Sequence, residues 1–84
     1  MSSAQDPHYQ AFLRRLKAAR RKAGMTQVEV AKRLGRPQSF VSKCESGERR
    51  VDVLELAEFA GLYRVPVDYF VKSAPAGFKR SSPT

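Results

Sequence analysis

The sequence predicts an all-α domain built from five short helices joined by short connections. Residue pairs that cap helix N-termini recur along the chain, and glycines follow several of the segments that these pairs open. Apolar residues within the segments recur every three or four positions, which is the period of one helix face. The valine-rich stretches are too short to indicate strands. A chain of 84 residues is long enough for one such domain.

The first helix is predicted to start at Asp6-Pro7 and to end at Gly24. Aspartate can cap a helix and proline fits its first position, whereas glycine suits the left-handed conformation that ends many helices. Between these limits, residues recur near helical spacing at Phe12, Leu13, Leu16, Ala19, Arg20 and Ala23.

The second helix begins at a capping box, in which the side chains of Thr26 and Glu29 can each satisfy a free backbone N–H at the other's position. It ends at glycine after little more than two turns, and Gly35-Arg36-Pro37 forms a tight break. Proline cannot continue the preceding helix but can open the next one. A third helix is therefore expected from Gln38 to Glu45, with Ser46-Gly47 as its stop.

The fourth helix is predicted from a second capping box, formed by Asp52 and Glu55. Gly61 lies inside this helix and should weaken it. Val65-Pro66 restarts the chain, and a last short helix is expected from Val67 to Val71. The predicted core comprises Leu16, Val30, Ala31, Leu34, Val41, Leu56, Phe59, Ala60 and Tyr63.

The two ends of the chain differ in composition from the middle. Residues 1–5 are small and polar, and residues 74–84 are rich in Pro, Gly and Ser, so we expect flexible ends around a domain at residues 6–73. No apolar run resembles a signal peptide or reaches the length of a membrane span. Cys44 is the single cysteine, which rules out an intramolecular disulfide. These features together favour the cytoplasm.

The charge balance points to a polyanionic partner. Sixteen Lys and Arg residues oppose eight Asp and Glu residues, giving a formal net charge of +8. Nucleic acid is the first candidate for such a partner, and an anionic membrane surface is the second. Charge alone is also compatible with an ordinary basic protein.

Two short helices joined by a tight, glycine-containing turn describe a helix-turn-helix motif, although helical hairpins are common. The identities of the residues make the helix-turn-helix interpretation more specific. The run MTQVEVAKRLGRPQSFVSKCESGERRVD resembles the group of regulators that includes phage repressors, Cro and xenobiotic-response-element (XRE) proteins. Cys44 departs from the pattern, which usually has a larger apolar residue there. The matching positions are Thr26-Gln27, Ala31, Gly35, Val41, Glu45, Gly47, Leu56, Phe59-Ala60, Tyr63, Val65 and Phe70.

The third helix is predicted to carry a reading face. On a wheel of ~100° per residue, Val41 and Cys44 point one way, and the polar residues Gln38, Ser39, Ser42 and Lys43 point the other. Glutamine suits adenine, lysine suits guanine and serine suits either. Phe40 lies between the two faces, so it is either a partly buried core residue or a contact for a thymine methyl group.

The resemblance implies a lambda-repressor-like fold and further residue roles. It places Gln27 near the DNA backbone, and Arg49 and Arg50 in a loop used against phosphates. It also pairs Arg20 with Glu45 as a structural link between the first and third helices. The full set expected to contact DNA is Gln27, Arg36, Gln38, Ser39, Phe40, Ser42, Lys43, Arg49 and Arg50.

These observations predict a transcriptional regulator, such as a repressor, that binds a palindromic operator in double-stranded DNA as a homodimer through the major groove. No cofactor, metal or small-molecule sensor domain is expected. Residues left over for a dimer interface are Val67, Tyr69, Val71 and Phe78.

Three alternatives remain open. An enzyme is disfavoured because His8 and Cys44 are the only His and Cys, and neither zinc-ligand spacing nor a phosphate-binding glycine loop is present. The basic first helix would suit a membrane-surface or partner-binding protein. An antitoxin or restriction–modification controller would keep the fold and add a protein partner or a linked gene.

Overall fold

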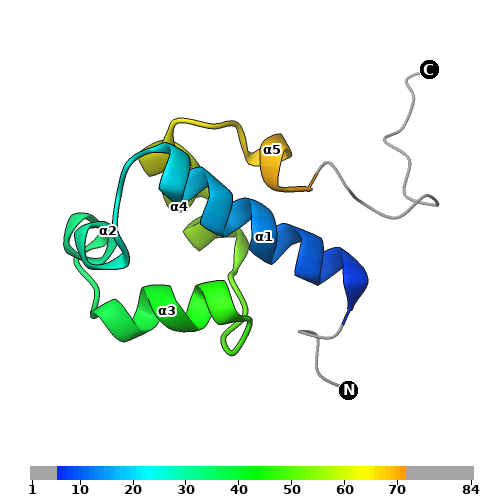
Figure 1. Ribbon diagram of the computed structural model, residues 1–84, viewed down its shortest axis with the longest axis horizontal. Coiled ribbons are helices and arrows are strands. Elements are labelled where there is room, and N and C mark those ends of the chain that lie inside the picture. Colours follow the sequence, from blue (N-terminus) through cyan, green and yellow to red (C-terminus); the bar gives the residue numbers. More distant parts are fainter. Residues whose placement is uncertain (1–5, 72–84) are drawn as a thin grey trace.

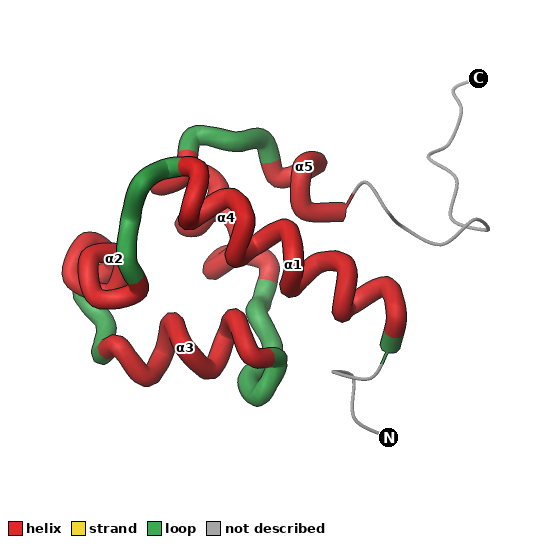
Figure 2. Tube along the Cα trace, in the orientation of Figure 1, coloured by secondary structure: helices red, strands yellow, loops and turns green. Residues whose placement is uncertain are grey.

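The computed structural model describes residues 6–71, which form five α-helices connected by short loops (Figure 1, Figure 2). The all-α prediction is confirmed, with every predicted helix present. The predicted flexible ends and Phe78 lie outside the described residues. The helices are α1 (Pro7–Lys22), α2 (Gln27–Leu34), α3 (Gln38–Ser46), α4 (Val53–Tyr63) and α5 (Val67–Val71).

Local side-chain caps fix where three of the helices begin. The carboxylate of Asp6 caps α1, which starts at the proline that follows it. Both capping boxes are formed: the Glu29 N–H donates to Thr26 Oγ1 at 3.1 Å, and the Glu55 N–H donates to Asp52 Oδ1 at 2.8 Å. In each box the glutamate in turn accepts from the backbone N–H of the capping residue. The starts of α2 and α4 are therefore encoded within four residues of sequence.

Two helix boundaries, the start of α3 and the end of α4, show details that the sequence pattern did not specify. Pro37 lies at the N-cap of α3 with extended backbone, one residue before the helix, so it opens α3 without being part of it. Arg64 ends α4 in the left-handed region, with φ of 60°, where glycine is the usual residue. Arginine, unlike glycine, does not indicate a left-handed backbone, so this conformation could not be predicted from the sequence.

The core lies between α1, α3 and α4, with Val30 and Ala31 of α2 and Phe70 of α5 contributing to it. Leu16, Val30, Val41 and Phe59 are fully buried, as predicted, whereas Leu34 and Leu56 lie at the margin and pack against the core while partly exposed. The predicted set omitted six apolar residues that are buried in the described part of the chain, namely Phe12, Leu13, Ala19, Phe40, Cys44 and Phe70.

Gly61 offers a direct test of the predicted weakness in α4. A Cβ added there meets nothing within 4 Å, and the backbone is not in the left-handed region. Gly61→Ala should therefore raise the free energy of unfolding by about 0.5–1 kcal/mol, through higher helix propensity and a less flexible unfolded chain. Thermal unfolding followed by circular dichroism measures the effect.

Gly35→Ala is the matched control for this prediction. It also has nothing within 4 Å of an added Cβ, but its φ is +69°. We expect it to destabilise by about 1–2 kcal/mol, because a side chain is strained in that conformation. A lower melting temperature for Gly61→Ala than for the wild type would show that the glycine is needed for another reason.

Candidate nucleic-acid interface

The turn between α2 and α3 sets the direction in which α3 leaves. Gly35 adopts the left-handed conformation, and the Arg36 N–H donates to the Ala31 carbonyl at 3.0 Å, closing the end of α2. Pro37 then starts α3 in a new direction, and the two helices pack against each other. The sequence Gly-Arg-Pro thus builds the turn of a helix-turn-helix.

The outer face of α3 is polar, as the wheel indicated. Gln38, Ser39 and Lys43 are exposed and Ser42 is half-buried, whereas Val41 and Cys44 on the opposite side are fully buried. Burial raises the pKa of the Cys44 thiol above its ordinary value, as expected for a core residue. The polar face is the part of α3 that is open to a macromolecular partner.

Phe40 is a core residue, which agrees with the first of the two alternatives that the sequence left open for it. Only 9% of the residue is exposed, and its ring stacks on that of Phe59 with 6.2 Å between centroids. The guanidinium groups of Arg36 and Arg49 lie 4.4 Å and 4.8 Å from its ring centroid. The ring therefore packs against the core on one side, and the two guanidinium groups separate it from solvent on the other.

A single carboxylate on α4 holds both of these arginines. Arg49 donates to the two carboxylate oxygens of Glu55 at 2.7 Å and 2.8 Å, and Arg36 approaches the same carboxylate at 3.5 Å. Arg36 also reaches Glu58, on the exposed side of α4, at 3.4 Å. We call these four residues and Phe40 the Glu55 cluster. It ties the turn before α3 and the loop after α3 to the same point on α4.

The cluster gives the two loop arginines different surroundings. Arg49, which is predicted to lie against phosphates, is 41% exposed and pairs with Glu55, and the hydrogen bonds of this pair raise the pKa of the guanidinium. Its role in the structure is to fix the loop. Arg50 is exposed, with its guanidinium 4.8 Å from the centroid of the Tyr9 ring, and within residues 6–71 it joins no ion pair. Arg50 is thus the loop cation left for an outside anion.

The Glu55 cluster predicts a change of stability with pH. The hydrogen bonds from Arg49 lower the Glu55 pKa to about 2, so this carboxylate stabilises the fold above pH 4.5 and loses that contribution as pH falls toward 2. Glu55→Gln should cost about 1–2 kcal/mol at pH 7, because glutamine keeps the capping box but loses the charge. The difference between wild type and variant should shrink below pH 4.

Urea denaturation at several pH values measures this difference. Glu58→Gln is the matched control, since that side chain is 49% exposed and its contact with Arg36 is long. It should change stability by less than about 0.5 kcal/mol at any pH. A constant gap between wild type and Glu55→Gln from pH 7 to 2 would contradict the assignment.

A second polar chain links α1 to the start of α3. Arg20 donates to the two carboxylate oxygens of Glu45 at 2.7 Å and 3.1 Å, and the Glu45 side chain is only 2% exposed. Gln27 donates to Glu45 at 3.0 Å and accepts from Gln38 at 3.4 Å. The structure therefore brings together the pair that the resemblance implied. It also places Gln27 between that pair and the first polar residue of α3.

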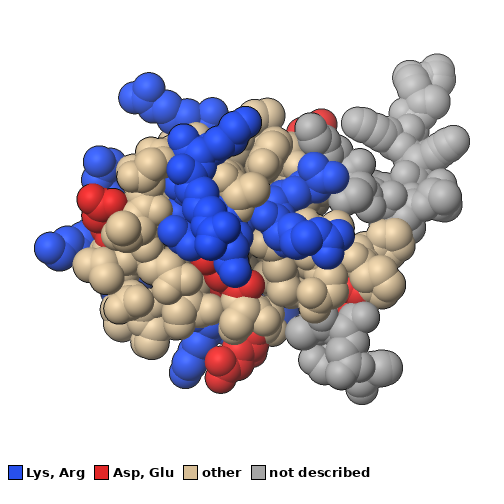
Figure 3. Space-filling model, viewed as in Figure 1, with Lys and Arg blue, Asp and Glu red and all other residues tan. Residues whose placement is uncertain are grey.

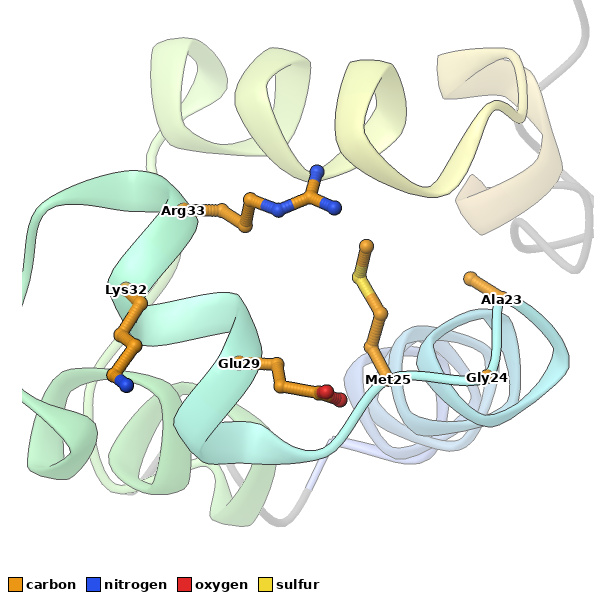
Figure 4. A pocket seen from close by; sticks show the side chains of 6 residues that line it. All are labelled: Ala23, Gly24, Met25, Glu29, Lys32 and Arg33. Carbon is orange, nitrogen blue, oxygen red and sulfur yellow. The ribbon is translucent and has the colours of Figure 1, made fainter.

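An open pocket of about 400 Å³ lies beside the turn between α1 and α2. Figure 4 shows the ends of the Met25 and Arg33 side chains approaching each other across it, while Lys32 points away. Glu29, which lines the pocket, is engaged in the capping box through one carboxylate oxygen. No group of three or more His, Cys, Asp or Glu side chains in the described part of the chain could hold a metal ion.

Comparison with known proteins agrees with this geometry. Residues 11–69 match the family described as "Helix-turn-helix domain". Over 58 residues, the chain is 40% identical to the HTH-type transcriptional regulator ImmR of Bacillus subtilis (strain 168). That alignment covers 69% of this chain and 46% of the relative, so the chain spans about half of the relative's length. No solved structure matches the chain. None of the helices between residues 6 and 71 is long and apolar enough to cross a membrane.

Proposed function

The chain belongs to the helix-turn-helix domain family, and from this premise we propose that it is a transcriptional regulator that binds double-stranded DNA in a sequence-specific manner through α3. The observation that carries the proposal is a polar α3 face held rigidly at both ends. The Glu55 cluster anchors the turn and the loop, and Glu45 anchors the helix itself to α1. The similarity to a transcriptional regulator supports the same function. We place the activity in the cytoplasm.

In this proposal α3 enters the major groove and its exposed side chains meet base edges. Gln38 suits adenine, Lys43 suits guanine, and Ser39 and Ser42 can serve either. Arg50 contacts a phosphate. Gln27 braces Gln38 by the 3.4 Å hydrogen bond, so the reading side chain is partly ordered before DNA arrives.

Selection from a pool of random duplexes tests the proposal. The wild-type protein should enrich one motif, and Lys43→Ala should enrich a motif altered at the base pair that Lys43 reads. Lys32→Gln is the control, because Lys32 is an exposed cation on α2 that lies outside the proposed interface. It should enrich the wild-type motif. Enrichment of no motif by the wild type would contradict sequence-specific binding.

We further propose that the protein binds a palindromic operator as a homodimer, with half-sites about one helical turn, ~34 Å, apart. Val67 and Val71 are 41% and 44% exposed on α5, so both side chains are open to contact with a second copy of the chain. Tyr69, also considered for the interface, packs partly against the core.

Replacing both valines by serine should weaken the dimer in sedimentation and lower operator affinity without loss of helix content. Val28→Ser is the control, since Val28 is 47% exposed on α2. It should leave the dimer intact. A monomer both free and saturated with the selected duplex would rule the dimer out.

A further inference from the structure

The outward face of α1 carries cations and no acid. α1 contains six basic residues and neither Asp nor Glu. Arg20 is turned inward to Glu45, whereas Arg14, Lys17 and Arg21 are all exposed. Their spacing of three and four residues places them in one line along the helix, which we call the α1 stripe. None of the three forms an ion pair with any residue between 6 and 71.

The α1 stripe does not belong to the α3 interface. α1 and α3 pack against each other through their buried sides, which the Arg20–Glu45 pair joins. Their exposed faces therefore point in different directions. Figure 3 shows Lys and Arg side chains gathered on the face where α1 lies in Figure 1, while α3 runs along the lower edge of that view. A straight duplex held by α3 would leave the α1 stripe open to solvent.

The chemistry of this face fits a phosphate backbone. The large apolar side chains that are exposed between residues 6 and 71 lie on α2, α4 and α5, and none lies on α1. The apolar side of α1 is used in the core, so little is left to insert into a membrane. The centres of protein–protein interfaces contain few charged residues, so a line of three cations does not fit the centre of such an interface. The α1 stripe spans ~10 Å, the length of about three phosphates along one strand.

We propose that the α1 stripe is a second nucleic-acid surface, which holds the phosphate backbone of another duplex segment irrespective of its sequence. With one segment on α3 and a second on α1, the protein would bridge two stretches of DNA. The bridging of two segments rests on the proposed function, because it requires α3 to bind the first segment of DNA. The affinity of the α1 stripe for phosphates does not depend on α3 reading a sequence.

The test compares two triple variants that lose the same charge. One variant, Arg14→Gln, Lys17→Gln and Arg21→Gln, removes the α1 stripe and keeps good helix formers. The control, Lys32→Gln, Arg33→Gln and Arg64→Gln, removes three other exposed cations. Each protein is loaded on an immobilised duplex that carries the selected motif, and a labelled mixed-sequence duplex is then added at about 50 mM salt. Loading and capture are measured separately, and circular dichroism verifies that both variants are folded.

We expect the stripe variant to load within about threefold of wild type but to capture the second duplex at least about tenfold more weakly. The slope of capture affinity against salt, on logarithmic axes, should become shallower by about 2.7, or 0.9 for each of three phosphate contacts. The control should capture within about twofold of wild type. These results together would support the α1 stripe as a bridging surface.

Three outcomes would overturn the proposal. Capture by the stripe variant at the wild-type level would mean that a second recognition helix holds the added duplex. Equal losses in the two variants would mean that net charge alone attracts it. Stripe-dependent binding to phosphatidylserine vesicles without duplex capture would assign the surface to a membrane. Failure to prefer the selected motif, with stripe-dependent binding of mixed-sequence duplex retained, would instead count against the proposed function only.

Discussion

Arg20→Ala is expected to lower the free energy of unfolding by about 3 kcal/mol, because it removes one partner of a buried ion pair. The Glu45 carboxylate is 2% exposed and receives two of its hydrogen bonds from Arg20. Without the guanidinium, Gln27 alone would be left to balance a buried negative charge. The Met25 carbonyl would lose a donor as well. A buried charge without a partner costs far more than the intact pair contributes.

Urea denaturation of three variants measures this effect. Arg14→Ala is the matched control, because it removes an exposed cation from the same helix and should cost less than about 0.5 kcal/mol. The double variant Arg20→Ala and Glu45→Gln should recover part of the loss, since no buried charge remains. Equal stability of Arg20→Ala and Arg14→Ala would show that the pair contributes nothing.

Most of the fold could be predicted from sequence because its limits are set locally. Each capping box is complete within four residues, and Gly24, Gly35 and Gly47 all take the left-handed conformation beside a predicted helix end. Arg64 takes the same conformation without a glycine, so its left-handed backbone could not be predicted, although Val65-Pro66 indicated that the chain restarts there. Beyond this turn, Val65 packs against the core and Phe70 is buried in it.

The Glu55 cluster could not be predicted, because it depends on contacts between distant residues. In the sequence, Glu55 is fully explained as the partner of Asp52 in a capping box. Its second role requires Arg36, nineteen residues earlier, and Arg49 to converge on the same carboxylate. Phe40 lies on the boundary between two helix faces, so the wheel alone does not decide whether it is buried. The two arginines and Phe59 decide it by enclosing the ring.

These contacts divide the residues predicted to contact DNA into two groups. Arg36, Phe40 and Arg49 were all expected at the interface, and all three belong to the cluster that fixes the ends of α3. The exposed set is left with Gln38, Ser39, Lys43 and, in the loop, Arg50. Within this set, the amide of Gln38 can pair with a base edge, whereas the guanidinium of Arg50 is suited to a phosphate. Substitutions at these two positions should therefore distinguish recognition of the base sequence from nonspecific electrostatic binding.

Gln38→Ala should weaken binding to the selected duplex by about 1–3 kcal/mol per half-site and change binding to scrambled duplex little. The amide can form hydrogen bonds with the edge of an adenine, and these bonds form only when the correct base pair is present. On a palindromic site the substitution occurs twice, so the loss could double. Gln38 is exposed and makes only a 3.4 Å bond to Gln27, so the fold should keep its stability.

Arg50→Ala is the matched comparison, because its expected contact is a phosphate. It should weaken binding to selected and scrambled duplexes about equally, since phosphate contacts carry little sequence information. The salt slope should become shallower by roughly one unit for each phosphate that the variant no longer neutralises, as fewer counterions are released. Affinity for both duplexes at several salt concentrations measures each effect. Unchanged sequence preference in Gln38→Ala would show that α3 does not read DNA at this position. If Arg50→Ala changes the sequence preference and leaves the salt slope the same, Arg50 contacts bases and not phosphates.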